Sequence, residues 1–184
     1  MSQDTLFLKL LRDTIRNVPN FPKPGIQFKD ITPVFHNPEL VRACVQHLVD
    51  PFRFQGVTKV AGIESRGFLL GPMIAQELHV PFVFIRKKGK LPVETSSREY
   101  ELEYGTATIE VQKSCLTSGD KVLIHDDLLA TGGTAQASAE LIQQVGAQPA
   151  GFSFLVDLNF LPGRDKLAQY QQPIHSLVSY GAGE

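Results

Sequence analysis

The side chains with the clearest chemical use lie between residues 122 and 135, where the sequence reads VLIHDDLLATGGTA. An apolar run leads into two adjacent acids, Asp126 and Asp127. Two carboxylates can accept hydrogen bonds from both hydroxyls of a vicinal diol, and each charged hydrogen bond contributes about 1.5–3 kcal/mol. The pair therefore indicates a site for a vicinal diol, although an isolated acidic pair is more often a solvated pair or a metal site.

The turn after the acids has the composition of a phosphate-binding loop. Its members are Ala130, Thr131, Gly132, Gly133 and Thr134. They place several backbone N–H groups and two hydroxyls at the start of a helical pattern. Glycine lets the backbone approach an anion closely, and the helix dipole favours negative charge there. The lysine of a Walker loop is missing, so ATP hydrolysis is not the natural interpretation.

A second anion site is predicted at Glu64, Ser65 and Arg66, which also lie between an apolar strand pattern and a helical pattern. The Arg66 guanidinium offers a planar fork of donors, which suits a diphosphate or stacking on a base. The alternative for Arg66 is a surface salt bridge.

Strand and helix patterns alternate along the chain and determine where these groups lie. Apolar or alternating segments predict strands at 57–63, 81–86, 106–111, 121–125, 151–158 and 174–180. Helical patterns cover 4–16, a segment that begins at Asn37-Pro38, and 67–78, 133–146 and 161–170. The alternation predicts an α/β fold with a mostly parallel central sheet flanked by helices. Ligands in such sheets bind beyond the carboxyl ends of the strands.

Two segments have no regular period. FPKPGIQFKDITPVF, at 21–35, is rich in proline and is expected to form turns. KKGKLPVETSSREYELEYG, at 87–105, is polar, and residues from about 90 to 104 are expected to form a long polar connection of the kind that is often a lid.

The composition is that of one folded domain spanning 1–184. Hydrophobic residues make up 42% and charged residues 20%, with a formal net charge of −1. That balance predicts neither a nucleic-acid nor a membrane partner. The two cysteines form no CxxC, which favours a reducing compartment. The N-terminus is too polar for a signal peptide, so we expect a cytoplasmic protein.

The DDLLATGGT segment resembles the 5-phosphoribosyl 1-diphosphate signature of the type I phosphoribosyltransferases. The resemblance implies that Asp126 and Asp127 hold the ribose 2′- and 3′-hydroxyls and that residues 130–134 hold the 5′-phosphate. It extends over nearly the whole chain to the branch of that family that acts on adenine. FPKPGIQFKDITPVF is similar to the base-binding hood, GIESRGFLLGP to the diphosphate loop, and RKKGKLP with YELEYG to the flexible catalytic loop.

The resemblance carries further expectations for the fold and its partners. It implies the type I phosphoribosyltransferase fold, with hood elements within about 1–36 and a flexible loop at about 88–106. It also implies a non-proline cis peptide between Glu64 and Ser65, a homodimer, and Mg²⁺ carried with 5-phosphoribosyl 1-diphosphate.

The choice of base depends on two places in the sequence. Enzymes of the family that act on 6-oxopurines usually have an aspartate at the place of Ala130, so alanine there favours adenine. The base would lie on Ile26, Gln27 and Phe28, with Phe28 against the purine face, where stacking contributes about 1–3 kcal/mol. The alternative for Phe28 is an ordinary core residue.

The polar segment supplies the remaining expected roles. A cationic run is usually a solvated face. Because an otherwise neutral chain needs local positive charge for a diphosphate, we assign Lys87 and Lys90 to it and leave Lys88 open. Glu103 matches the family's catalytic glutamate, which helps to remove the N9 proton of adenine; Glu101 is its competitor. Tyr104 would shield the site from water.

The predicted activity is therefore purine salvage, which converts adenine and 5-phosphoribosyl 1-diphosphate into AMP and diphosphate. The first alternative is a phosphoribosyltransferase for xanthine or hypoxanthine. The second is a non-catalytic regulator that senses 5-phosphoribosyl 1-diphosphate and binds DNA. Only 20 residues precede the hood motif and the chain is not basic, so the sequence has no footprint of DNA binding.

Overall fold

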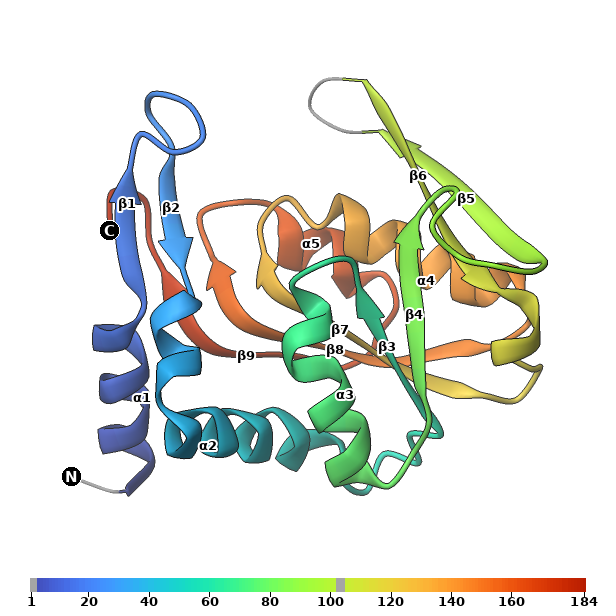
Figure 1. The fold of residues 1–184 in the computed structure, drawn as a ribbon, viewed down its shortest axis with the longest axis horizontal. Helices are drawn as coiled ribbons and strands as arrows, with labels where there is room; N and C mark the ends of the chain where they lie inside the picture. Colours follow the sequence, from blue (N-terminus) through green and yellow to red (C-terminus); the bar gives the residue numbers. More distant parts are fainter. Residues whose placement is uncertain (1–2, 102–104) are drawn as a thin grey trace.

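The computed structural model describes residues 3–101 and 105–184, and its main feature is a seven-stranded sheet (Figure 1). The strands within these ranges are β3 (Lys59–Ile63), β4 (Phe82–Lys87), β5 (Thr95–Glu101), β6 (Thr106–Gln112), β7 (Lys121–Leu129), β8 (Gln148–Leu158) and β9 (Ile174–Tyr180). Their order is β5-β6-β4-β3-β7-β8-β9. The five strands from β4 to β9 in this order are parallel, whereas β6 and β5 continue the sheet in antiparallel pairing.

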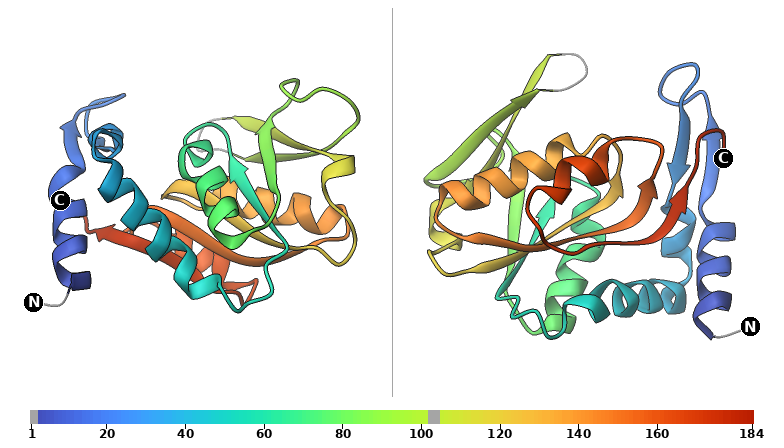
Figure 2. Two further views of the ribbon diagram at one scale, coloured as in Figure 1. Left: turned by 60° about the horizontal axis from the view of Figure 1, so that its bottom comes forward. Right: turned by 180° about the vertical axis from the view of Figure 1, so that it is seen from behind.

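Helices cover both faces of this sheet, as Figure 2 shows from two further sides. They are α1 (Gln3–Thr14), α2 (Pro38–Val49), α3 (Gly67–Leu78), α4 (Gly133–Gln144) and α5 (Gly163–Ala168). One buried cluster joins α1, α2 and α3 to the sheet, and a second joins α4 and α5 to its other face. The predicted α/β fold, with a mostly parallel central sheet flanked by helices, is confirmed.

Neighbouring residues of β7 illustrate how the two cores form. Leu123 packs in the cluster with α2 and α3, whereas Ile124 packs in the cluster with α4. Successive side chains of a strand point to opposite faces, so the part of β7 that is covered on both sides, residues 122–124, is apolar on both faces. The helix start predicted at Asn37-Pro38 is confirmed. The Asn37 side chain caps α2 by accepting a hydrogen bond from the Leu40 N–H at 3.1 Å.

The N-terminal part forms a separate antiparallel hairpin of β1 (Arg16–Pro19) and β2 (Gln27–Asp30), followed by a 3₁₀ helix at Thr32–His36. The expectation that 21–35 holds no regular element is therefore wrong in part. Four-residue strands are too short to show an alternating pattern. The helix predicted at 4–16 ends at Thr14, because Arg16 already pairs with Asp30 in the hairpin.

The polar segment at 87–105 also differs from the expectation of an irregular connection. Residues Thr95 to Glu101 form β5, which pairs with β6 from Thr95↔Gln112 to Glu101↔Thr106. This strand lies at the edge of the sheet and is mostly exposed or half-buried, so it carries no apolar alternation for the sequence to reveal. Glu103 and Tyr104, to which the sequence assigns roles, lie outside the described residues.

The described helices are short, at 12 residues or fewer. A helix that crosses a bilayer needs roughly 20 apolar residues. No helix in the described part of the chain is therefore long and apolar enough to cross a membrane.

Candidate active site

The two adjacent acids lie within β7, not after it. The sequence predicts that this strand ends at His125, but its backbone pairing with β8 continues to Leu129↔Asp157. A pair of carboxylates looks like the start of a loop because charged groups are rarely placed in a central strand. Here the sheet holds Asp126 and Asp127 at the carboxyl edge, where ligands of parallel sheets bind.

The carboxylate pair is under electrostatic strain that a suitable ligand would relieve. Burial, followed by the charge of Asp127, raises the pKa of Asp126 well above its ordinary value. Burial also raises the pKa of Asp127, while the charge of Arg66 acts in the opposite direction. Asp127 is 4% exposed, and its Oδ2 lies 2.9 Å from Arg66 Nε, although the two atoms are not aligned as a hydrogen bond. Hydroxyl donors or a cation would favour the ionised carboxylates.

The predicted phosphate loop connects β7 to α4 and encloses a small hollow. The hollow has a volume of about 90 Å³, and all five predicted loop residues line it together with Asp126. Gly132 caps α4 with a positive φ of 77°, and its carbonyl accepts a hydrogen bond from Gln136 N at 2.9 Å. A Cβ at Gly132 would lie 2.9 Å from the Cα of Gly163, so a side chain has no room there. The structure thus brings the residues predicted for ribose and for phosphate to one place.

The predicted diphosphate segment follows β3 and contains the non-proline cis peptide between Glu64 and Ser65, which confirms that expectation. The Glu64 side chain is occupied: its Oε2 accepts from Arg86 Nε at 3.1 Å and from Lys87 N at 3.0 Å. Burial opposes ionisation of Glu64, but these hydrogen bonds hold its pKa below the ordinary value. The Glu64 carboxylate therefore ties β3 to β4, and the donors for an anion would come from Ser65 and Arg66.

The cationic run begins at the end of β4, beside this segment. Lys87, Lys88 and Lys90 are exposed. The backbone of Lys90 is fixed, because its N–H donates to Glu110 Oε1 at 3.0 Å and its carbonyl accepts from Arg86 Nη1 at 3.0 Å. The three lysines thus lie at and after the end of β4, the strand that pairs with β3 just before Glu64 to Arg66.

Arg66 connects this anion site to the predicted base platform. Its guanidinium carbon lies 5.1 Å from the centre of the Phe28 ring, and the Phe21 ring meets Phe28 edge-on at 5.0 Å. An open, mainly apolar hollow of about 510 Å³ adjoins these rings. Its lining residues are Phe21, Phe28, Asp30, Ile31, Thr32, Phe35, Arg66 and Leu69. Phe28 is only half-buried and lines this hollow, which argues against an ordinary core role.

The other two predicted platform residues do not line this hollow. The Ile26 side chain is 44% exposed. The Gln27 side chain is also exposed and accepts a hydrogen bond from Asn17 Nδ2 at 3.1 Å. Ile26, which directly precedes β2, and Gln27, the first residue of β2, could instead offer their backbone groups to a base.

Sequence reasoning missed Tyr100 and Gly163. The Tyr100 hydroxyl lies 3.2 Å from Thr134 Oγ1, at the phosphate loop. The sequence could have indicated Tyr100, because this residue begins the YELEYG segment that resembles part of the catalytic loop. Gly163 lies against Gly132, which is 31 residues earlier in the sequence, and no local sequence pattern predicts that contact.

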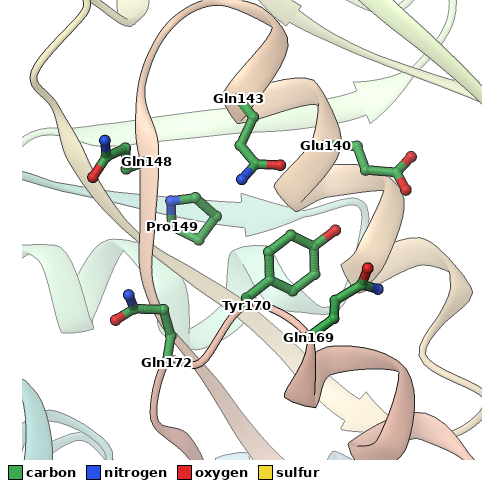
Figure 3. Close-up of a pocket in the computed structure, with 7 residues that line it drawn as sticks. All are labelled: Glu140, Gln143, Gln148, Pro149, Gln169, Tyr170 and Gln172. Carbon is green, nitrogen blue, oxygen red and sulfur yellow. The ribbon is translucent and has the colours of Figure 1, made fainter.

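A larger polar hollow lies elsewhere on α4, as Figure 3 shows. Its volume is about 440 Å³, and its lining residues are Glu140, Gln143, Gln148, Pro149, Gln169, Tyr170 and Gln172. None of the residues predicted for the site lines it. It is larger than the hollow at the phosphate loop but smaller than the hollow of about 510 Å³ beside Phe28.

Comparison with known proteins gives consistent results. The family model described as a phosphoribosyl transferase domain matches residues 34–176. A curated adenine phosphoribosyltransferase from Nitrosococcus oceani is 50% identical over 173 residues, which cover 94% of this chain and 100% of that protein. The crystal structure of adenine phosphoribosyltransferase from Rhodothermus marinus matches with a TM-score of 0.90 and 50% identity, covering 96% of this chain and 99% of the other.

The adenine phosphoribosyltransferase of Saccharomyces cerevisiae, complexed with D-2,5-dideoxy-2,5-imino-altritol 1,6-bisphosphate and adenine, also matches. Its TM-score is 0.88 and its identity 40%, with 95% of this chain and 99% of that chain covered.

Proposed function

Because the chain belongs to the adenine phosphoribosyltransferase family, we propose that it transfers the 5-phosphoribosyl group of 5-phosphoribosyl 1-diphosphate to N9 of adenine. The products are AMP and diphosphate, so the reaction salvages a purine base. The observation that carries the proposal is the Arg66 side chain, which contacts both the carboxylate at the phosphate loop and the ring at the apolar hollow. A sugar phosphate and a flat base could thus lie side by side.

The sugar half of the substrate would lie at the end of β7. Asp126 and Asp127 would accept hydrogen bonds from the 2′- and 3′-hydroxyls. This interaction would also stabilise the ionised form of carboxylates whose pKa burial raises. The backbone N–H groups and hydroxyls of residues 130–134 would hold the 5′-phosphate at the N-terminus of α4.

The leaving group would lie at the ends of β3 and β4. Ser65 and Arg66 would contact the diphosphate together with Lys87 and Lys90, which are exposed. Mg²⁺, carried on substrate oxygens, supplies charge neutralisation of the leaving diphosphate when it is bound. The described residues include no group of three metal-ligating side chains. The carboxylate pair still fits a role beside the ion, because a nearby cation would offset its repulsion.

The base would enter the apolar hollow with one face on Phe28, while backbone groups at residues 26–28 contact its edge. Reaction breaks the bond from C1′ to the diphosphate oxygen and forms the bond from C1′ to N9, with inversion at C1′. The N9 proton passes to a base, for which we propose Glu103, and Tyr104 would exclude water from the cationic ribosyl centre.

Two variants test the choice between the neighbouring glutamates. Glu103→Ala is expected to lower kcat with adenine by about 10²–10⁴, with little change in the unfolding midpoint. Glu101→Ala is the matched control, since Glu101 is exposed at the end of β5. If the control loses activity while Glu103→Ala keeps its kcat, the assignment moves to Glu101.

A homodimer in the cytoplasm is also part of the proposal. Phe84 of β4 is 47% exposed, and its ring meets the rings of Phe68 and Phe82 edge-on at 5.1 and 4.9 Å. Met73 of α3 is 43% exposed. Such an uncovered apolar surface suits a second copy of the chain. Sedimentation analysis is expected to give a dimer for the wild type and a monomer for Phe84→Ser; a monomeric wild type would contradict the proposal.

The decisive experiment for activity measures nucleotide formation from 5-phosphoribosyl 1-diphosphate and Mg²⁺ with adenine, hypoxanthine, guanine and xanthine in parallel. AMP from adenine alone is the expected result. Product from an oxopurine instead would keep the phosphate and ribose sites but refute the base assignment. Binding of the substrate without any product would point to a sensor.

A further inference from the structure

The edge strand β5 rests on α4 through two side-chain contacts that the proposed reaction does not explain. Arg98 Nη2 lies 2.7 Å from Glu140 Oε2, which forms an ion pair near the middle of the helix. Two residues further along the same strand, the Tyr100 hydroxyl lies 3.2 Å from Thr134 Oγ1. The backbone of Tyr100 is held opposite Ala107 of β6. The tyrosine is therefore fixed from both sides and points at the N-terminal turn of α4.

Thr134 is the second residue of α4 and lines the hollow of the phosphate loop. Its carbonyl already accepts a hydrogen bond from Ser138 Oγ at 2.8 Å. Its hydroxyl has one proton to donate and two lone pairs that can accept. If the Tyr100 hydroxyl donates to one lone pair, the Thr134 proton stays available for an anion in the hollow. A chain of hydroxyls that point in one direction also strengthens its last donor.

We propose that Tyr100 is a positioning residue for the 5′-phosphate. Its hydroxyl donates to Thr134 Oγ1 and thereby directs the Thr134 proton toward a phosphate oxygen. Tyr100 acts through Thr134 and takes no part in bond making at C1′. The inference rests on the proposed function, because it assigns the hollow to the phosphate of 5-phosphoribosyl 1-diphosphate.

The first test measures binding of 5-phosphoribosyl 1-diphosphate with Mg²⁺ by calorimetry. Tyr100→Phe is expected to raise Kd about three- to tenfold, which is the effect of one hydrogen bond. The KM for adenine and the unfolding midpoint should not change. Tyr170→Phe is the matched control, because its hydroxyl bonds the Gln136 carbonyl of the same helix at 3.3 Å, away from the phosphate loop. An unchanged or lowered Kd for Tyr100→Phe would overturn the proposal.

A second ligand pair isolates the phosphate from the rest of the substrate. Tyr100→Phe should weaken AMP binding by the same factor and leave adenosine binding unchanged, since adenosine has no 5′-phosphate. Equal weakening of both nucleosidic ligands would place the effect on the base or ribose and overturn the proposal.

A double-mutant cycle tests whether Tyr100 works through Thr134. In a Thr134→Val background, Tyr100→Phe should cause no further loss of affinity, because the hydroxyl that it orients is gone. Additive losses would overturn the proposed route. If the wild type binds no 5-phosphoribosyl 1-diphosphate, the proposed function itself fails. Normal wild-type binding with an unaffected Tyr100→Phe refutes the positioning role alone.

Discussion

Replacing Gly132 by alanine tests the close contact between the phosphate loop and α5. Gly132 has a φ of 77°, a conformation that costs an L-residue about 1–2 kcal/mol. Its new Cβ would also lie 2.9 Å from Gly163 Cα and 3.0 Å from Gly163 O, atoms of a backbone that cannot rotate away. Overpacking of this kind costs about 1–3 kcal/mol. The sum is a loss of about 2–5 kcal/mol in the free energy of unfolding.

Two further glycines separate the parts of this estimate. Gly89 has a φ of 81°, close to that of Gly132, but a Cβ added there would meet no heavy atom within 4 Å, so Gly89→Ala reports the backbone cost alone. Gly133 has no positive φ, and its Cβ would lie at an ordinary 3.7 Å from Glu101 O. As the first residue of α4, it should tolerate alanine in the unliganded chain without loss of stability.

Urea unfolding at neutral pH measures all three variants. The expected order of stability is Gly133→Ala, then Gly89→Ala, then Gly132→Ala. Gly132→Ala should also lose affinity for 5-phosphoribosyl 1-diphosphate, because the loop must move to relieve the contact. If Gly132→Ala is no less stable than Gly89→Ala, the contact with Gly163 does not affect stability. If it matches Gly133→Ala, both parts of the reasoning are refuted.

Three other substitutions have definite expected results. Asp127→Asn should weaken binding of 5-phosphoribosyl 1-diphosphate by about tenfold or more, because a charged acceptor is lost; unchanged affinity in calorimetry would contradict the ribose assignment. His125 is fully buried, and burial lowers its pKa to about 4 from 6.5. Between these pH values the unfolded chain binds a proton at His125 that the folded chain does not bind, so the contribution of His125 to stability should fall by up to about 3 kcal/mol as pH drops from 6.5 to 4. His125→Gln should flatten this part of the profile in urea unfolding at several pH values, and an unaltered slope would assign it to other groups. Asn37→Ala should cost about 1 kcal/mol of stability in thermal unfolding, whereas Asn37→Asp should keep the cap of α2 and the stability.

The residues that the sequence predicts for the phosphate end of the site come together in one hollow, because the signals for them are local. An apolar strand, two acids, small residues and a helical period follow one another within 14 residues, and each has a direct structural meaning. The same holds for the cap of α2 at Asn37. The assigned roles of these site residues remain predictions until the binding experiments are made.

The parts that sequence reasoning missed depend on partners distant in the chain. β5 has no apolar face of its own and forms by pairing with β6. β7 extends past His125 because β8 lies beside it. Arg66 meets Phe28 and Asp127, which are separated from it by 38 and 61 residues respectively. No periodicity in a single segment encodes such contacts.

The two halves of the candidate site belong to sheets of very different size. Asp126 and Asp127 lie in a central strand of the seven-stranded sheet, whereas Phe28 lies in a hairpin whose described strands pair only with each other. An isolated two-stranded hairpin is marginally stable in water, so its amide protons should exchange through local opening well before those of β7. We therefore expect the sugar-phosphate surface to be ordered before binding and the base surface to become more ordered on binding. The affinity for adenine should then be the more sensitive of the two to temperature and to mild denaturant.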